Sequence, residues 1–130
     1  MSPADEVKKT TLRNGERAEP ADIWKARKFI REHLADKISL SEVGESAHIS
    51  PNYLSEKFKQ VTGVNFVEYI AQSRTEKARD LLQNSSRRIS EIAFAVGFQS
   101  LSQFNRVFRR LTGKSPRTYR AAGSKQTMRR

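Results

Sequence analysis

The chain repeats one helical pattern twice, about 50 residues apart, and this duplication restricts the fold more than any other feature. Residues 49–63 read ISPNYLSEKFKQVTG, and residues 98–113 read FQSLSQFNRVFRRLTG. When the two copies are aligned on their shared Thr-Gly ending, Leu54 matches Phe104, Phe58 matches Phe108 and Val61 matches Leu111. Tyr69 downstream matches Tyr119. A repeated helical unit of this size predicts one module used twice rather than two unrelated halves.

Helix start and stop signals divide the first copy into two helices. The capping box SLSE at residues 39–42 predicts a short helix over about residues 40–47. His48 follows at a turn position, and histidine tolerates left-handed backbone better than most residues do. The Ser-Pro pair at residues 50–51 then starts a longer helix, which Gly63 ends.

The second copy repeats this arrangement with one residue added in its turn. Apolar spacing predicts a short helix that ends at Gly97, although Arg88 stands where the first copy has its capping serine. Ser100 caps the longer helix, which ends at Gly113. A final short helix is predicted to end at Tyr119.

Two further helices complete an all-α pattern of seven helices without a strand signal. An amphipathic run predicts a first helix over about residues 22–36, and a start signal at Asn65 opens a long helix over about residues 66–83. The polar residues 1–21 are predicted to be a disordered tail or linker, and residues 122–130 a disordered basic tail.

Each copy therefore has the layout of a helix-turn-helix, at about residues 39–63 and 89–113. This layout suits DNA because a helix fits the major groove, and residues near its N-terminus reach base edges. A domain over residues 22–121 is predicted, in which two homeodomain-like helix-turn-helix subdomains are joined by the long connecting helix.

The charge of the chain favours a polyanionic partner. Its 25 Lys and Arg residues outnumber 14 Asp and Glu residues, for a net charge of +11. Residues 38–70 have a balance of −2, whereas residues 86–121 carry eight basic residues and one acid, a balance of +7. The second copy is expected to grip phosphates more strongly. The alternative is a solvated surface whose excess charge only aids solubility.

Missing features argue against several function classes. The chain has no cysteine, which excludes disulfides, thiolate zinc sites and cysteine nucleophiles. His33 and His48 have no adjacent ligand pattern, so neither a metal nor a cofactor is expected. No phosphate-binding glycine loop or nucleophile elbow is present, which argues against an enzyme. Without a signal peptide or a membrane-spanning run, the sequence indicates a cytoplasmic protein that does not bind membranes.

The sequence resembles the DNA-binding domain of the AraC/XylS transcription regulators over about residues 22–121. The most specific motif is ISEIAFAVGFQSLSQFNRVFRRLTGKSPRTYR at residues 89–120, and LSEVGESAHISPNYLSEKFKQVTGVNFVEYI at residues 40–70 is its first copy. The resemblance implies a monomeric domain that binds double-stranded DNA, with its two recognition helices in adjacent major-groove turns. Regulators of this family commonly contact RNA polymerase, so the resemblance implies that partner and is compatible with an activator, while the sequence leaves repression open as the alternative.

The outward faces of the two recognition helices, together with Arg117 just beyond the second one, are expected to contact DNA. In the first motif these residues are Asn52, Ser55, Glu56 and Lys59, and in the second they are Leu101, Ser102, Gln103, Asn105, Arg106, Arg109, Arg110 and Arg117. The resemblance implies base contacts from all of these except Lys59, Gln103, Arg109, Arg110 and Arg117. Arg106 can fork onto a guanine and Asn105 onto an adenine. The alternative for each outward residue is a solvated side chain or a phosphate contact.

The inward residues of the first motif are expected to form its core. Tyr53, Leu54, Phe58 and Val61 share one stripe of the recognition helix, and Trp24 lies on the apolar stripe of the first helix. These five side chains are therefore predicted to be buried.

Two residues of the first motif depart from the family pattern. Glu56 sits where a basic or neutral polar residue is usual, so it would repel nearby phosphates unless it accepts a hydrogen bond from a cytosine. Gly44 occupies the place of Ala93 in the second copy and costs about 1 kcal/mol of helix propensity, for which close helix packing is a sufficient reason. The first motif is expected to bind DNA more weakly or to read mainly its shape.

Another interpretation is a basic helical adaptor that docks an acidic protein or RNA polymerase. Sequence preference for duplex DNA that survives added salt distinguishes the two interpretations. Because members of the family commonly carry a sensor domain, the chain is expected to be either a stand-alone regulator or the C-terminal piece of a longer one. The linker-like start slightly favours the second.

Overall fold

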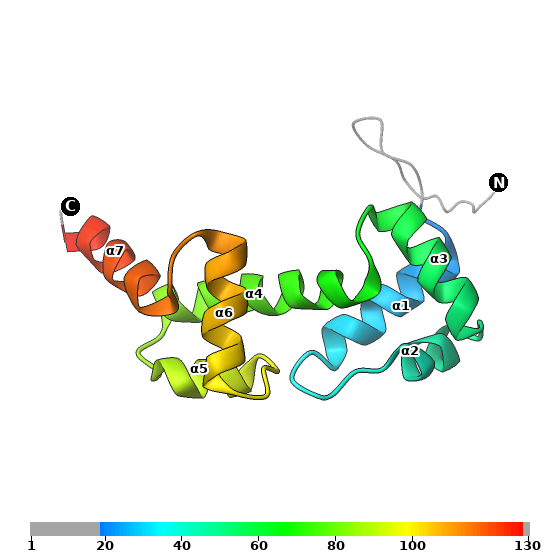
Figure 1. The fold of residues 1–130 in the computed structure, drawn as a ribbon, viewed down its shortest axis with the longest axis horizontal. Coiled ribbons are helices and arrows are strands. Elements are labelled where there is room, and N and C mark those ends of the chain that lie inside the picture. The colour runs from blue at the N-terminus through cyan, green and yellow to red at the C-terminus, as the bar shows by residue number, and fades with distance from the viewer. Residues whose placement is uncertain (1–18, 129–130) are drawn as a thin grey trace.

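One long helix, α4, runs through two small helical bundles and belongs to both (Figure 1). The computed structural model of the chain describes residues 19–128, which form seven helices and no strand, and this confirms the all-α prediction. The helices are α1 (Ala21–Glu32), α2 (Leu40–Ala47), α3 (Pro51–Thr62), α4 (Phe66–Asn84), α5 (Ile89–Ala95), α6 (Leu101–Thr112) and α7 (Pro116–Met128). We define the first subdomain as α1 to α3 with the N-terminal half of α4, and the second subdomain as the rest.

Buried apolar side chains form two separate clusters, one in each subdomain. Phe66 and Ile70 near the start of α4 belong to the first cluster, whereas Ala78 and Leu82 near its end belong to the second. Removal of apolar surface from water is the main driving force of folding, so each subdomain has its own source of stability. The shared helix holds the two cores in line.

The helix caps predicted from the sequence are present. Ser39 Oγ accepts from the backbone N–H of Glu42 at 3.1 Å, and the Glu42 carboxylate accepts from the backbone N–H of Ser39 at 3.2 Å. Ser50, Asn65 and Ser100 cap α3, α4 and α6 with their side chains in the same way. These caps satisfy backbone donors that a helix N-terminus otherwise leaves unpaired.

Left-handed backbone ends helices where the sequence predicts it. His48 has φ 61° after α2, and Gly63 and Gly113 have φ 86° and 85° after α3 and α6. At the start of α5 the side chain of Arg88 makes no cap, as expected, and its backbone N–H donates to the Glu91 carboxylate at 3.1 Å.

Two helix ends differ from the prediction. α1 ends at Glu32 instead of about residue 36, because the guanidinium of Arg74 on α4 binds the carbonyl oxygens of Leu34 and Asp36 at 3.1 and 2.8 Å. α7 continues past Tyr119 to Met128, so most of the segment predicted as a disordered tail is helical. The rest of that segment, residues 129–130, and residues 1–18 of the predicted N-terminal tail lie outside the described residues.

Three side chains that were predicted to be buried are exposed. Trp24 is 52% exposed, Tyr53 44% and Val61 37%. Trp24 and Tyr53 each lie one position from a fully buried residue, Ile23 and Leu54. One position turns a side chain by about 100° around a helix, which carries both rings out of the core. Val61 lies in the last turn of α3.

Candidate nucleic-acid interface

The structure forms a short helix, a turn and a longer helix in each subdomain, α2 with α3 and α5 with α6 (Figure 1). His48 makes the first turn with left-handed backbone, and Gly97 makes the second with φ 109°. The backbone N–H of Ile49 donates to Gly44 at 2.9 Å, and that of Phe98 donates to Ala93 at 3.0 Å. Both copies therefore present their longer helix through the same kind of turn.

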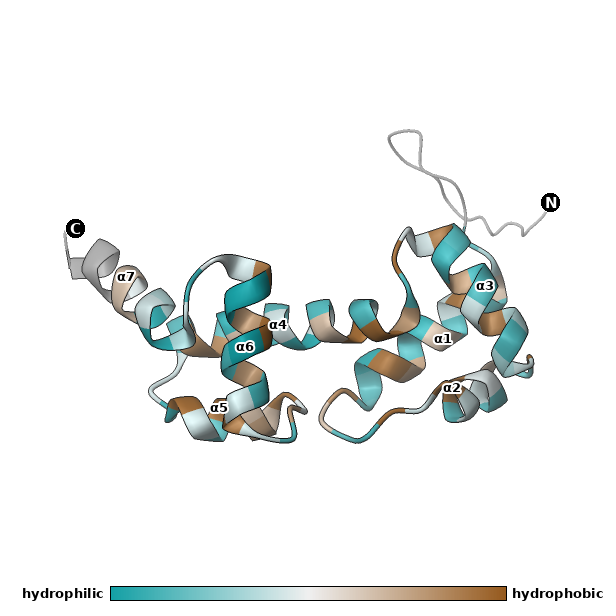
Figure 2. Ribbon diagram, viewed as in Figure 1, coloured by the Kyte–Doolittle hydropathy of each residue, from teal (hydrophilic) through white to brown (hydrophobic). Residues whose placement is uncertain are grey.

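The helix α6 has one buried face and one polar face. Phe104 and Phe108 are fully buried, and their rings meet edge to face with centroids 5.5 Å apart. Most of the opposite side is hydrophilic, as Figure 2 shows. The residues exposed on this helix are Leu101, Ser102, Asn105, Arg106, Arg109 and Arg110, all of them predicted contact residues.

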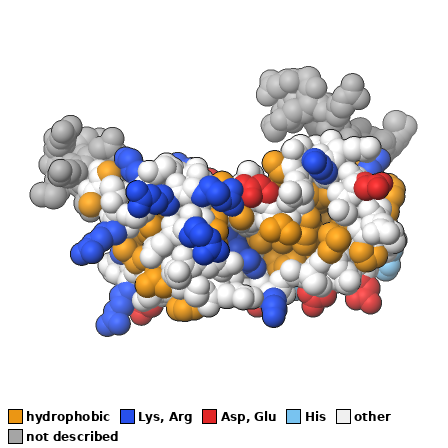
Figure 3. Space-filling view, in the orientation of Figure 1, with side chains coloured by type: hydrophobic (Ala, Val, Ile, Leu, Met, Phe, Trp, Pro, Cys, Tyr) orange, Lys and Arg blue, Asp and Glu red, His pale blue; other side chains and the backbone are white. Residues whose placement is uncertain are grey.

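A groove of about 660 Å³ lies beside α6 and carries only positive charge. Arg88 precedes α5, Arg109 comes from α6, and Arg117 comes from α7. Leu101 and Asn105 of α6 also line the groove. In Figure 3 the Lys and Arg side chains gather on the face formed by the second subdomain. Such a groove attracts a polyanion through the added potential of its cations.

Arg120 also lines this groove but has a structural role. Its guanidinium donates to the carbonyl oxygens of Leu82, Ser85 and Arg87 at 2.9, 3.1 and 2.7 Å. These carbonyls lie where α4 passes into α5, so the side chain of Arg120 fixes the connection between the two helices. Sequence reasoning did not identify this role.

Two predicted contact residues of the second motif have partners within the chain. Arg110 forms a bidentate pair with Glu68 on α4, with N–O distances of 3.1 and 3.2 Å. Hydrogen bonding to Arg110 holds the pKa of the Glu68 carboxyl below its ordinary value. The Gln103 side-chain oxygen accepts from the backbone N–H of Gln99 at 2.9 Å, and Gln103 is half-buried.

The outward face of α3 is less charged than that of α6. Asn52, Ser55, Glu56 and Lys59 are all exposed, as predicted. Tyr53 joins them near the N-terminus of α3, and sequence reasoning missed this residue because it assigned the ring to the core. The phase of the helix was the available signal, since the neighbouring Leu54 is the residue that matches the buried Phe104.

The described residues lack two other functional features. No group of three or more His, Cys, Asp or Glu side chains among them is placed to hold a metal ion. Within residues 19–128, no helix combines the length and apolar composition needed to cross a bilayer.

Comparison with known proteins adds to this geometry. The family described as a helix-turn-helix domain matches residues 43–122. YobQ, an HTH-type transcriptional regulator of Bacillus subtilis, is 37% identical over 92 residues, which are 71% of this chain and 38% of that protein. The chain spans about a third of the length of YobQ and of two other curated relatives, YijO of Escherichia coli and PocR of Salmonella typhimurium.

Solved structures share the same arrangement of helices. The C-terminal domain of AraT, a response regulator from Geobacillus stearothermophilus, superposes with a TM-score of 0.77 at 34% identity, over 82% of this chain and 88% of that one. The DNA-binding domain of the transcriptional factor AdpA, solved in complex with a target DNA, gives a TM-score of 0.75 at 27% identity, over 79% of this chain and 93% of that one.

Proposed function

This chain belongs to the AraC-type helix-turn-helix family of transcription regulators, and from that membership we propose that it binds specific sequences of double-stranded DNA and so regulates transcription. α3 and α6 are its two recognition helices, each in one of two adjacent major-groove turns. Adjacent turns of B-DNA are about 34 Å apart, and the shared helix α4 provides a rigid spacer between the two motifs. The similar domain of AdpA was solved in complex with a target DNA, and this supports DNA as the partner.

The observation that carries the proposal is the polar face of α6 beside the basic groove. Asn105 and Arg106 are exposed on that face, and each side chain can form two hydrogen bonds with the edge of one base. We assign Arg106 to a guanine and Asn105 to an adenine. Arg109 and Arg117 then neutralise phosphates along the groove.

The first motif contributes less electrostatic attraction. Lys59 is the single cation among its proposed contact residues, and Glu56 brings a negative charge. We assign Asn52 and Ser55 to base edges near the N-terminus of α3, with the exposed ring of Tyr53 beside them. The second motif therefore supplies most of the affinity.

One chain contains both motifs, so no second copy is needed to span two groove turns. We propose that the domain binds DNA as a monomer, and that contact with RNA polymerase follows once it is bound. Sedimentation of the protein with and without a duplex tests the first point. A bound complex that contains two chains per site would contradict it.

The test of the function is selection of binding sites from a random duplex library, followed by affinity measurements at rising salt. We expect an enriched sequence that stays preferred over a scrambled duplex as salt increases, because phosphate contacts alone fall steeply with salt and ignore sequence. A library that shows no enrichment would favour the alternative of a basic adaptor for an acidic protein or RNA polymerase.

A further inference from the structure

The last turn of α6 and the turn that precedes this helix both contact the first subdomain. In its last turn, Arg110 reaches across to Glu68 at the start of α4 and forms the bidentate pair described above, at 3.1 and 3.2 Å. Glu68 lies in the turn of α4 that carries Phe66, part of the first core. The pair therefore joins the second recognition helix to the framework that carries the first.

The turn before α6 makes the second contact. A Cβ atom on Gly97 would lie 2.1 Å from the Leu34 carbonyl oxygen and 2.5 Å from Arg74 Nε. Leu34 belongs to the first core, and Arg74 binds its carbonyl oxygen at 3.1 Å. The backbone of the second turn thus rests directly on the connection between α1 and α2.

The space between these two contacts is not closely packed. A hollow of about 240 Å³ separates Ile38 and Phe66 of the first subdomain from Val107 of α6. In Figure 3 hydrophobic side chains are visible on the surface between α6 and α3. Because close packing does not fix the two subdomains here, their relative orientation depends on α4, on the Glu68–Arg110 pair and on the contact at Gly97.

We propose that Glu68 and Arg110 are positioning residues, and that their ion pair restricts the protein to DNA sites with one separation between the two half-sites. This inference rests on the proposed function. A bidentate Arg–carboxylate pair holds a defined geometry, which a single contact does not. The matching position in the first motif is Gln60, which is exposed and cannot form such a pair.

Two N–H donors of the Arg110 guanidinium bind the Glu68 carboxylate, so this carboxylate and a DNA phosphate would compete for the same donors. A role in phosphate binding predicts opposite effects for the two partners. Loss of the Arg110 charge would weaken binding, whereas loss of the Glu68 charge would release Arg110 and strengthen it. A role in positioning predicts the same effect from both substitutions.

The experiment compares the selected duplex with duplexes in which the half-sites are one base pair closer or farther apart. The ratio of affinities for the selected and altered spacings is measured for wild type, Glu68→Gln, Arg110→Gln and the charge-reversed double variant Glu68→Arg with Arg110→Glu. We expect each single substitution to lower the ratio about two- to fivefold, in keeping with the strength of such pairs, and the double variant to restore it. Glu45→Gln and Arg31→Gln change exposed charges elsewhere and should leave the ratio unchanged.

Particular results overturn the proposal. Unchanged ratios in both single variants would do so, and so would an Arg110→Gln variant that weakens all duplexes alike while Glu68→Gln strengthens them. A wild-type chain that enriches no sequence would overturn the proposed function as well. If wild type enriches a sequence but the single variants keep the same preference for one half-site spacing, only this inference would be overturned.

A distance measurement gives a second readout without DNA. The chain has no cysteine, so spin labels can be attached at Gln60→Cys on α3 and Arg109→Cys on α6. We expect one narrow distance distribution in this labelled chain and a broader one after Glu68→Gln is added. Equal widths would contradict the positioning role.

Discussion

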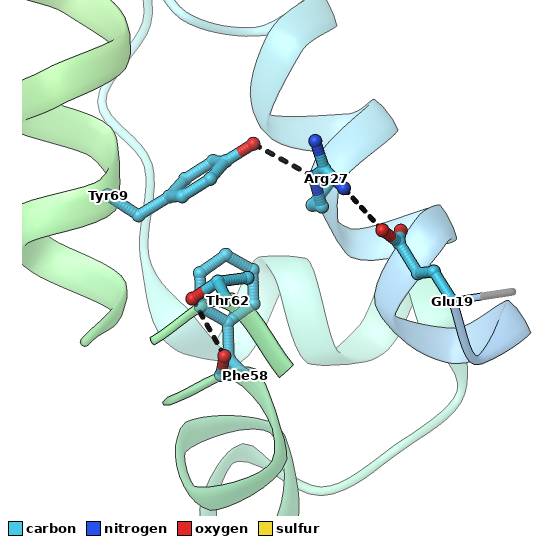
Figure 4. Close-up of polar contacts among 5 residues, drawn as sticks. All are labelled: Glu19, Arg27, Phe58, Thr62 and Tyr69. Carbon is cyan, nitrogen blue, oxygen red and sulfur yellow. Dashed lines mark hydrogen bonds and ion pairs between the residues drawn. The ribbon is translucent and has the colours of Figure 1, made fainter. Parts of the chain in front are cut away.

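Arg27 on α1 donates its Nε–H to the hydroxyl oxygen of Tyr69 on α4 at 3.0 Å, and Arg79 on α4 makes the same bond to Tyr119 on α7 at 3.1 Å. Figure 4 shows Arg27 between Tyr69 and Glu19, with the aromatic ring of Phe58 below. The duplication therefore extends beyond the two helix-turn-helix motifs. α4 is the closing helix of the first subdomain and the opening helix of the second.

The paired bonds predict matching effects on stability. Tyr69→Phe and Tyr119→Phe remove only a hydroxyl and leave the ring contacts with Phe58 and Phe108, whose centroids lie 4.9 and 5.4 Å away. We expect each substitution to lower the free energy of unfolding by about 1 kcal/mol, measured by urea denaturation. Tyr53→Phe, at an exposed ring, should change it by less than about 0.5 kcal/mol. If only one of the two substitutions lowered the free energy of unfolding, the two Arg–Tyr bonds would not be equivalent.

The parts of the fold that local chemistry determines were predictable from the sequence. The serine caps and the glycines after α3 and α6 act within a few residues of their own position, so their signals can be read directly. The exposed rings of Trp24 and Tyr53 were not predicted, because the apolar stripe assigned to each helix was one position too wide, and one position turns a side chain out of the core.

The part of the candidate site that depends on distant contacts was not predictable. Arg110 and Glu68 are 42 residues apart in the chain, and nothing near either residue indicates their pairing. The same is true of Arg120, whose three carbonyl partners lie 33 to 38 residues earlier. Outward phase predicts exposure, but it cannot distinguish an arginine that is free to bind DNA from one already bound within the protein.

For the substitution Gly44→Ala, helix propensity predicts an increase in the free energy of unfolding, whereas packing predicts a decrease. Alanine favours a helix interior by about 1 kcal/mol over glycine, yet a Cβ atom here would lie 2.7 Å from the Ile49 carbonyl oxygen. Because backbone atoms cannot move aside cheaply, we expect Gly44→Ala to lower the free energy of unfolding by about 1–3 kcal/mol. Ser41→Ala, at an exposed position of the same helix, is the control. An increase in stability would show that the turn has room to relax.

The unequal charges of the two motifs predict unequal losses of DNA affinity. Arg109 and Lys59 occupy matching exposed positions, but Arg109 lines the basic groove. We expect Arg109→Gln to weaken binding to all duplexes more than Lys59→Gln does, because Arg109 shares its groove with other arginines whereas Lys59 lies near Glu56. The slope of log affinity against log salt should fall by about one for each phosphate that the variant no longer neutralises. Equal losses of affinity would contradict the assignment of most affinity to the second motif.

Replacement of Arg106 is the most direct test of whether the protein recognises particular bases. The side chain of Arg106 is exposed on α6, away from the buried Phe104 and Phe108, and its fork suits the two acceptors of a guanine. We expect Arg106→Ala to weaken binding to the selected duplex by about 1–3 kcal/mol and to relax preference at one or two adjacent base pairs, seen by repeating the selection. Glu56→Ala at the matching position of α3 is the comparison, and it should instead relieve repulsion from nearby phosphates unless Glu56 reads a cytosine. If Arg106 grips a phosphate, every duplex weakens alike and the preference stays intact. That result would leave Asn105 and Ser102 as the residues that read the bases.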